Sequence, residues 1–344
     1  MAYFRFAHIS DLHFAREADR PRPLVQHVVD RKSSATASIN TWIDAKSYGL
    51  KRRLISPPSH SSDLARSLAY ALRNYHATKP FDFILATGDL ATTGQREDLT
   101  VAKDFLFSEA ENSLDSWRRG KLISSLANLD VDIYLLPGNH DRYQGKKKLY
   151  FPANKEFDTI FSDQWKSRRG VSGWLVEKRG GGEKLAIYLA DFSLKYSADA
   201  TLRYQGGIWG QGRAYQITLN YLQFLTRQSK ENGYPVIWAM HFAPEFPNIR
   251  ENLKLLGENE VISAAKSVDV EYIFCGHTHH QDAYESKLVD GVNVICSGSS
   301  TECTFPPAHI GNSVQVISLE VDGNKIVAAP HDEIKCSEYG VYEI

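Results

Sequence analysis

The chain has 344 residues, of which 42% are hydrophobic and 24% are charged. This balance is typical of a compact globular protein, and it excludes an intrinsically disordered chain. Lys and Arg number 40 and Asp and Glu 41, and the resulting formal charge of −1 excludes a global positive field that would draw the chain onto nucleic acid or an anionic membrane.

Short apolar runs rich in β-branched and aromatic residues predict strands, and helical spacing of apolar residues predicts helices between several of them. Strands are expected at residues 3–10, 81–88, 131–137, 185–192, 234–241, 270–275, 292–297 and 313–321. Helices are expected at residues 62–79, 95–110, 117–128, 153–165, 215–230 and 258–267, the first with Ser62 or Asp63 as its N-cap. The first half thus alternates between β and α, and the end of the chain is mainly β, which favours central sheets with helices outside.

Two long connections interrupt this alternation, at about residues 14–62 and 142–184. Connections of this length in a compact domain usually carry function or contain small elements of their own. The glycine run at residues 180–182 precedes a predicted strand and indicates a hairpin turn, not a domain boundary. No repeat or Pro- or Ser-rich linker divides the sequence, so we expect a single domain over residues 1–344, with the long connections near its active site.

The sequence shows no sign of a membrane segment or a secretion signal. The start, MAYFRFAHIS, alternates like a strand, and no apolar run approaches the roughly 18 residues that a membrane helix needs. No Cys-x-x-Cys pair occurs, so we expect the cysteines to be free and mostly buried thiols. They are Cys275, Cys296, Cys303 and Cys336. We therefore expect a cytoplasmic protein.

Five of the predicted strands end in polar residues that can bind metal ions. The fragments are SDLH at 10–13, TGDL at 87–90, PGNHD at 137–141, AMHF at 239–242 and CGHTH at 275–279. One such fragment alone would indicate only a turn or a core histidine. Because sites in open α/β sheets form outside the carboxyl ends of the strands, we expect all five to lie on one rim.

Together the fragments supply carboxylates, an amide and imidazoles, but no thiolate. The candidate ligands are Asp11, His13, Asp89, Asn139, His140, His241, His277 and His279. Mixed nitrogen and oxygen ligands suit Mn, Fe, Zn or Co in five- or six-coordinate geometry. The set is too large for one ion, but it fits two ions about 3.5–4 Å apart that share a bridging carboxylate, an arrangement suited to in-line attack on phosphorus.

The order Asp-x-His, Gly-Asp, Gly-Asn-His-Asp, His, Gly-His-x-His resembles the complete signature of the calcineurin-like metallophosphoesterases, from Asp11 to His279. The resemblance implies an α/β fold, an α+β sandwich of four αββα layers, with two central mixed β-sheets and a dinuclear metal centre at their edge. In one departure, the run HFAPE places its proline at Pro244, one step later than in many relatives. This leaves His241 as a candidate ligand but puts substrate contacts in the following residues in doubt.

The resemblance also implies roles for the candidate residues, and two divalent transition-metal ions, Mn, Fe or Zn, as cofactors. Asp11, His13 and His279 would hold one ion, Asn139, His241 and His277 the other, and Asp89 would bridge both. A metal-bound hydroxide would attack phosphorus, and His140 would donate a proton to the leaving oxygen. Asp141 would orient the ring of His140.

The motifs look most like those of the cyclic-nucleotide phosphodiesterase branch of the family. They favour a phosphodiesterase that acts on a small or nucleotide-like diester. The alternative is a phosphomonoesterase or protein phosphatase, which shares every ligand. A nuclease is disfavoured by the neutral net charge, so nucleic acid is not expected as a partner, and a non-catalytic scaffold is disfavoured by the intact His140.

Substrate contacts are expected in the long connections, where residues 14–62 hold nine Lys or Arg against four Asp or Glu. Solvated loop faces account for these charges as readily as a basic rim that captures a phosphate does. The weak candidates are Arg52 and Arg53 for phosphate binding and Trp209 for stacking on a base, although core packing explains Trp209 equally well. The pattern sets no oligomeric state.

Overall fold

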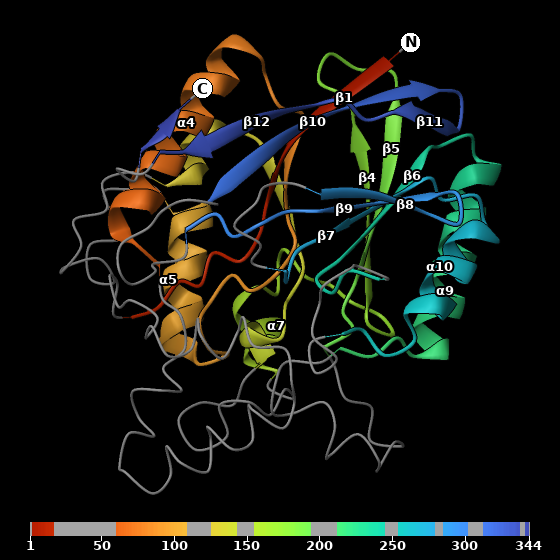
Figure 1. The fold of residues 1–344 in the computed structure, drawn as a ribbon, viewed down its shortest axis with the longest axis horizontal. Helices are drawn as coiled ribbons and strands as arrows, with labels where there is room; N and C mark the ends of the chain where they lie inside the picture. Colours follow the sequence, from red (N-terminus) through yellow and green to blue (C-terminus); the bar gives the residue numbers. More distant parts are fainter. Residues whose placement is uncertain are drawn as a thin grey trace, which may run out of the picture.

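The computed structural model describes residues 2–16, 60–108, 125–142, 155–193, 212–244, 254–278, 285–301, 312–337 and 341–343. Within these ranges two mixed β-sheets lie between outer helices. Helices α4 and α5 lie on one side of the paired sheets, and α9 and α10 lie on the other (Figure 1). The predicted four-layer αββα sandwich is therefore confirmed.

The first sheet has seven strands in the order β13-β12-β10-β1-β2-β3, with β11 paired to β10. Their bounds are Ala2–Ile9 for β1, Phe83–Ala86 for β2, Asp132–Leu135 for β3, Ser313–Asp322 for β10, Lys325–Ala328 for β11, His331–Cys336 for β12 and Tyr342–Glu343 for β13. Strands β1, β2 and β3 are parallel, and the other pairings are antiparallel. The carboxyl ends of these three strands therefore share one edge.

The second sheet has six strands in the order β4-β5-β6-β7-β9-β8. Their bounds are Val171–Glu177 for β4, Lys184–Ala190 for β5, Val236–Met240 for β6, Tyr272–Cys275 for β7, Glu285–Val289 for β8 and Val292–Cys296 for β9. Strands β5, β6, β7 and β9 are parallel, and the two edge strands are antiparallel to their neighbours. The β4–β5 hairpin turns through residues 180–182, as the glycine run predicts, and all three glycines have positive φ.

The described helices follow the predicted ranges in four of the six places. Their bounds are Ser62–Thr78 for α4, Arg96–Phe107 for α5, Glu156–Ile160 for α7, Gln216–Glu231 for α9 and Glu258–Lys266 for α10, with short 3₁₀ turns η1 at Leu126–Leu129 and η2 at His140–Arg142. The N-cap of α4 is Ser61, whose side chain accepts a hydrogen bond from the Leu64 N–H, and not Ser62 or Asp63 as expected.

Two predicted helices differ from the structure. The helix expected at 117–128 coincides in its described part with the start of η1, which ends where Asp130 takes a left-handed conformation; residues 117–124 lie outside the described ranges. The helix expected at 153–165 is described only as α7. The chain turns after it, and the N–H of Trp165 donates to the Phe161 carbonyl, which lets the indole pack against Phe157.

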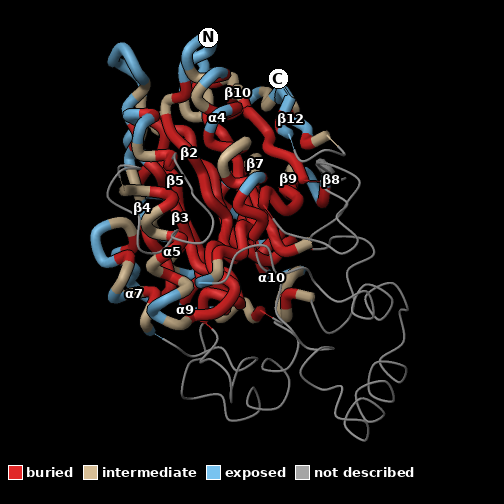
Figure 2. The backbone as a smooth tube through the Cα atoms, turned by 90° about the vertical axis from the view of Figure 1, so that its left-hand side faces the viewer, coloured by how far each residue is buried: buried red, intermediate tan, exposed pale blue. Residues whose placement is uncertain are grey.

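The core follows the period-two alternation of the strands. On β5, Leu185, Ile187 and Leu189 face the core between the sheets, whereas Ala186 and Tyr188 face helices α9 and α10. The T-shaped contact of Phe6 with Phe274, at 5.2 Å between ring centroids, joins β1 of one sheet to β7 of the other. Figure 2 shows buried residues along most of the central strands β2, β5 and β7.

Two smaller expectations can be compared with the described residues. Cys275, Cys296 and Cys336 are buried thiols outside any disulfide, as predicted, while Cys303 lies outside the described ranges. Among the described helices, none is both long enough and apolar enough to cross a membrane.

Candidate metal centre

The carboxyl ends of five strands bring most of the predicted ligands to one place. Asp11 and His13 follow β1, Asp89 follows β2, Asn139 and His140 follow β3, His241 follows β6 and His277 follows β7. All seven side chains are buried, and the most accessible residue among them, His140, is 9% exposed. The remaining predicted ligand, His279, lies outside the described residues.

Asp89 belongs to two groups of possible ligand atoms. It groups with His13 and His140 on one side and with His241 and His277 on the other, and within each group the atoms lie within 4.8 Å of one another. Two adjacent sets of donors thus share a single carboxylate. This is the donor arrangement that two ions with a bridging carboxylate require, so the residues present fit the dinuclear centre that the family signature implies.

The carboxylate of Asp89 is held between backbone and imidazole groups. Its Oδ1 accepts a hydrogen bond from the N–H of His140 at 2.8 Å. Its Oδ2 is buried without a hydrogen bond among the described residues, 3.2 Å from His241 Nε2 and 3.9 Å from His140 Nε2. Burial opposes ionisation, but the imidazoles of His241, His140 and His13 hold the pKa of Asp89 well below its ordinary value. A cation beside Oδ2 would offset the cost of burying this oxygen.

The ring of His241 is oriented as a metal ligand would be. Its Nδ1 lies 2.8 Å from the Thr87 carbonyl oxygen and donates to it, so Nε2 of the neutral ring carries a lone pair. This Nε2 lies 3.1 Å from Asn139 Oδ1 and 3.1 Å from His277 Nδ1. Burial lowers the pKa of His241, but the charge of Asp89 outweighs it and raises the pKa to about 9. The carboxylate of Asp89 therefore favours a positive charge beside it, which either a metal ion or a proton on His241 can supply.

Asp11 lies beside these groups and ties them together through the backbone. Its Oδ2 accepts a hydrogen bond from the N–H of His277 at 2.9 Å, and its Oδ1 lies 4.0 Å from His13 Nε2. The N–H of Asp11 donates to the Gly88 carbonyl, and the N–H of His13 donates to the Asp89 carbonyl. The loops after β1, β2 and β7 are thus bound directly to one another.

Four of the candidate ligands have a left-handed backbone, which residues other than glycine rarely adopt. The φ angles are 52° at Asp11, 50° at His13, 50° at Asp89 and 70° at His277. Such conformations cost on the order of 1–3 kcal/mol each and persist only where surrounding contacts determine them. Their concentration at one place is typical of a functional site.

Two glycines of the signature allow the loops to approach one another. A Cβ at Gly138 would overlap the carboxylate and the N–H of Asp89, and a Cβ at Gly276 would overlap the Ser10 hydroxyl and approach the Asp11 carboxylate within 2.8 Å. Close backbone approach, which only glycine permits, therefore explains both positions.

The predicted contact between Asp141 and the ring of His140 is wrong. His140 Nδ1 lies 2.9 Å from the Thr92 carbonyl oxygen and donates to it, which directs Nε2 toward Asp89. The two residues are neighbours in the 3₁₀ turn η2, where successive side chains point about 120° apart, so they cannot readily face each other.

The carboxylate of Asp141 binds backbone amides instead. It accepts hydrogen bonds from Leu90 at 3.1 Å, Ala91 at 2.7 Å and Gly138 at 2.9 Å. Burial, followed by the nearby charge of Asp89, raises the pKa of Asp141 to about 7, although the three amides oppose this shift. Asp141 thus joins the loops after β2 and β3.

Sequence reasoning missed the loop after β9, residues 297–301, as a support of the site. The hydroxyl of Ser299 donates to the Asp11 carbonyl at 2.8 Å, and the N–H of Ser300 donates to the Ser10 carbonyl at 3.0 Å. Buried hydroxyls that bind a neighbouring loop have no signature beyond their polar side chains.

The predicted substrate contacts, Arg52, Arg53 and Trp209, lie outside the described residues. Within the second long connection, Arg168 and Arg169 are exposed, and their guanidinium groups lie 5.7 Å and 5.6 Å from the ring centroid of Tyr221 on α9. These two basic residues therefore lie against an aromatic surface, and the structure assigns them no substrate.

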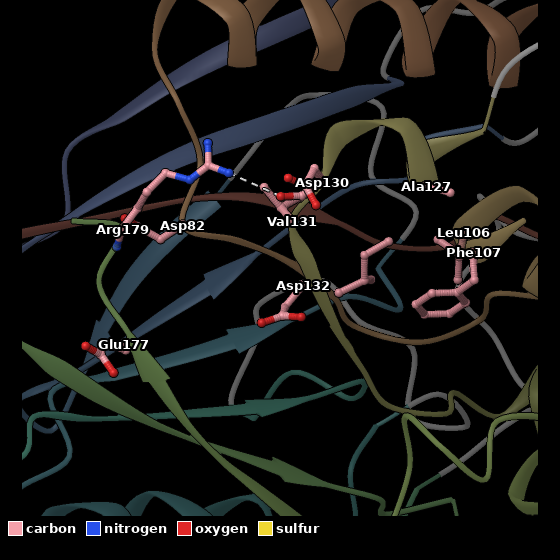
Figure 3. Close-up of a pocket in the computed structure, with 10 residues that line it drawn as sticks. Asp82, Leu106, Phe107, Ala127, Asp130, Val131, Asp132, Glu177 and Arg179 are labelled. Atoms are coloured by element: carbon pink, nitrogen blue, oxygen red, sulfur yellow. Dashed lines mark hydrogen bonds between the residues drawn. The ribbon is translucent and has the colours of Figure 1, made fainter. Parts of the chain in front are cut away.

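A cavity of about 520 Å³ lies at the opposite ends of β2 and β3, where these strands begin. It is lined by Asp82, Leu106, Phe107, Ala127, Asp130, Val131, Asp132, Ile133, Glu177 and Arg179. Arg179 donates to the Asp130 carbonyl oxygen at 3.2 Å across part of its wall (Figure 3). No candidate ligand lines this cavity, so it is separate from the candidate metal centre.

Comparison with known proteins bears on the whole arrangement. Residues 4–281 match a family model described as calcineurin-like phosphoesterase. A search of curated protein sequences finds no match.

Solved structures share the fold at low sequence identity. The chain is similar to a dimetal phosphatase from Danio rerio, with 13% identity, a TM-score of 0.54, and coverage of 95% of this chain and 98% of that one. It is also similar to an anchor protein of the inner membrane complex of Plasmodium, with 11% identity, a TM-score of 0.43, and coverage of 96% and 88%. The first likeness supports the fold, and the second is too distant to add to it.

Proposed function

The chain belongs to the calcineurin-like phosphoesterases, and from this membership we propose that it is a dimetal-dependent phosphodiesterase of a small or nucleotide-like phosphodiester. Membership implies a metal-dependent phosphoric ester hydrolase, and the diester preference is the finer part of the proposal. The observation that carries it is the position of Asp89, which lies in both groups of possible ligands.

The proposed cofactors are two divalent transition-metal ions, Mn, Fe or Zn. The residues that would hold them are Asp11, His13, Asp89, Asn139, His241, His277 and His279. When bound, the ions would supply an activated water near neutral pH and compensate the negative charge on the phosphate. The chain's contribution is to fix the ligands: the Thr87 carbonyl sets the tautomer of His241, and the loops after β1, β2 and β7 hold the carboxylates.

His140 is proposed as the proton donor to the leaving oxygen. Because its Nδ1 donates to the Thr92 carbonyl, Nε2 is the ring atom that faces the site. A proton on Nε2 would pass to the departing oxygen, and this transfer matters most when that oxygen is strongly basic. The same nitrogen lies in a group of possible ligand atoms, so a role as metal ligand is the competing assignment.

The charge of the site favours a diester over a monoester. A phosphodiester carries one negative charge near neutral pH, whereas a monoester carries about two and needs more cationic compensation. The nearby guanidinium of Arg142 already binds two carboxylates, those of Asp158 and Asp191. The similarity of the motifs to the cyclic-nucleotide phosphodiesterase branch supports the same choice.

We also propose that residues 1–344 form a single domain. The support is that β1, at the start of the chain, pairs with β10, and that the family match spans residues 4–281. Neither sheet would be complete without strands from distant parts of the sequence.

The test compares hydrolysis of bis-p-nitrophenyl phosphate and p-nitrophenyl phosphate by the purified protein with added Mn²⁺. We expect a large preference for the diester, and loss of both activities after chelation. Asp89→Asn, purified in parallel, controls for contaminating phosphatases. A preference for the monoester would replace the proposal by a phosphomonoesterase, and no hydrolysis of either ester with Mn²⁺, Fe²⁺ or Zn²⁺ would overturn it.

A further inference from the structure

Arg142 is a fully buried arginine that lies two residues after His140, and its guanidinium binds two carboxylates. Its Nε and one terminal nitrogen donate to Asp191 Oδ2 at 3.1 Å and 2.7 Å. Its two terminal nitrogens donate to the two oxygens of Asp158 at 2.9 Å each. The guanidinium also lies 5.2 Å from the ring centroid of Phe157. All of its nitrogens are therefore engaged, so the side chain has one orientation.

These partners belong to different parts of the fold. Arg142 ends η2, the turn that follows β3 of the seven-stranded sheet, whereas Asp191 directly follows β5 of the six-stranded sheet. Asp191 is itself fixed, because its carboxylate accepts from the N–H and hydroxyl of Ser193 and its N–H donates to the Gly170 carbonyl. The guanidinium thus ties the turn that carries His140 to the opposite sheet.

The other two residues of the turn attach it to the loop after β2. The N–H of His140 donates to Asp89, the ring of His140 donates to the Thr92 carbonyl, and the Asp141 carboxylate accepts from the N–H of Ala91 at 2.7 Å. These contacts fix the side of the turn toward the seven-stranded sheet. The ion pair of Arg142 with Asp191 fixes the side toward the six-stranded sheet.

Stability alone is a weak explanation for such a group. The cost of removing three charges from water is comparable to what their attraction returns, and apolar residues of similar volume often replace a buried ion cluster without loss. What bidentate pairs provide is a defined direction, because the planar guanidinium matches a carboxylate in only a few geometries. Asp191 and Asp158 also keep the pKa of Arg142 raised although burial opposes it, so its charge is permanent.

We propose that Arg142 is a positioning residue, whose ion pairs with Asp158 and Asp191 hold the η2 turn so that His140 Nε2 meets the leaving oxygen of the substrate. The inference rests on the proposed function, because it takes His140 as the proton donor. A merely structural role would predict a uniform loss of rate or of folded protein. Positioning predicts a loss that depends on the leaving group.

The central experiment uses Arg142→Lys in the full-length, Mn²⁺-loaded protein, with two diesters of the same phosphoryl group. One diester releases p-nitrophenolate, which departs without a proton, and the other releases an alkoxide, which needs one. We expect the rate on the alkyl diester to fall at least about tenfold more than the rate on the aryl diester. Bound metal, measured by elemental analysis, should stay at the wild-type level.

Two milder substitutions should give graded differences between the two diesters, and they replace Arg142→Lys as the test if that variant does not fold. Asp191 is fully buried and binds two guanidinium nitrogens through one oxygen, whereas the Asp158 side chain is 35% exposed. Asp191→Asn should therefore show the larger difference between the two diesters, and Asp158→Asn a smaller one of the same sign. Leu72→Ala is the control for lost stability. It shortens a buried side chain of α4 and leaves a cavity in the core, so it should lower both rates equally.

A second readout needs no turnover. In protein labelled with ¹⁵N-histidine, the ring signals of His140 should shift or broaden in Arg142→Lys and Asp191→Asn, while those of the buried His60 stay unchanged. His140→Ala assigns the signal. This measurement reports the position of the ring whether or not the chain hydrolyses an ester.

The outcomes separate the two proposals. If the wild type hydrolyses neither diester, the proposed function fails, and unchanged His140 ring signals in the variants would then overturn the positioning role as well. If His140→Ala loses rate selectively on the alkyl diester but Arg142→Lys, Asp191→Asn and Asp158→Asn do not, only the inference about Arg142 is overturned. Equal losses on both diesters, or the same selectivity in Leu72→Ala, would also overturn it.

Discussion

His140 Nδ1 lies 2.9 Å from the carbonyl oxygen of Thr92, so the orientation of the ring is set by the backbone of the loop after β2. A carbonyl can only accept, and it therefore fixes the proton on Nδ1 whenever the ring is neutral. The nitrogen that faces Asp89, Nε2, is then the one that exchanges protons or binds a metal. No substitution at Thr92 that preserves the backbone removes this control.

Removal of the His140 ring should affect reactions with poor leaving groups most. General-acid help contributes about 10²–10⁴-fold, and p-nitrophenolate does not require it. His140→Ala should therefore retain both metals and lose far more rate on an alkyl or ribose leaving group than on p-nitrophenolate. Steady-state rates on both kinds of ester, together with elemental analysis of the bound metal, test this prediction. Loss of bound metal, or equal losses on both esters, would make His140 a ligand or a phosphate contact.

Asp141→Asn should damage the site without regard to the leaving group. The carboxylate accepts from three backbone amides, and the side-chain NH₂ of an asparagine would face at least one of these donors. Leaving buried amides without an acceptor costs on the order of 1–3 kcal/mol. We expect a lower denaturation midpoint and similar losses on aryl and alkyl diesters. The exposed Asp332→Asn is the matched control, and selective loss on the alkyl diester would restore a direct action on His140.

The two ions should depend unequally on the two aspartates. We expect the purified protein to hold close to two transition-metal ions per chain, because the candidate ligands fill two coordination shells. Asp89→Asn should lose both ions and nearly all activity, since its carboxylate serves both groups, whereas Asp11→Asn should weaken chiefly one. Elemental analysis of both variants tests this, and an Asp89→Asn protein with two ions and full turnover would refute the bridging assignment.

Acid should destabilise the fold through His60. This ring is fully buried, accepts a hydrogen bond from the N–H of Ala15 and lies against Phe14, and burial lowers its pKa from 6.5 to about 3. Between these values the unfolded chain binds a proton that the folded chain refuses. The stability is therefore intact above pH 6.5 and falls by about 1.4 kcal/mol per pH unit below it, until the folded pKa is reached.

The measurement is the free energy of unfolding by urea between pH 7 and pH 4. In His60→Asn, whose amide oxygen can replace Nδ1 as the acceptor, the dependence on pH should be smaller by the contribution of one proton. An equal slope in His60→Asn and wild type would show that His60 is protonated in the fold.

The strands that the sequence predicted are those with nearly continuous apolar runs. All of them except β10 have a parallel neighbour, and strands of parallel sheets are buried on both faces. The strands it missed are polar or interrupted. β12, HDEIKC, exposes one face, and β8, ESKLV, is an edge strand with Leu288 largely exposed. Their pairing depends on register with neighbours that are distant in sequence. Periodicity within a window contains no such information.

The convergence of Asp11, Asp89 and His241 was predictable because the strand-end rule needs only the position of each motif along the chain. The contacts that orient the site were not. The partner of the His140 ring is a backbone carbonyl, which any residue at position 92 supplies. Asp191, which binds Arg142, lies 49 residues away in a segment without a motif.

The hydrogen bond from the His277 amide to Asp11 joins residues 266 positions apart, and β1 is completed by β10 from the last part of the chain. A chain that has been synthesised only as far as β3 contains Asp11, His13 and Asp89 but neither the second sheet nor β10, the antiparallel partner of β1. Closing so long a loop comes late in folding. We therefore expect ion capture at the proposed centre to follow chain closure, because the two halves of the ligand set meet only when both sheets are in place.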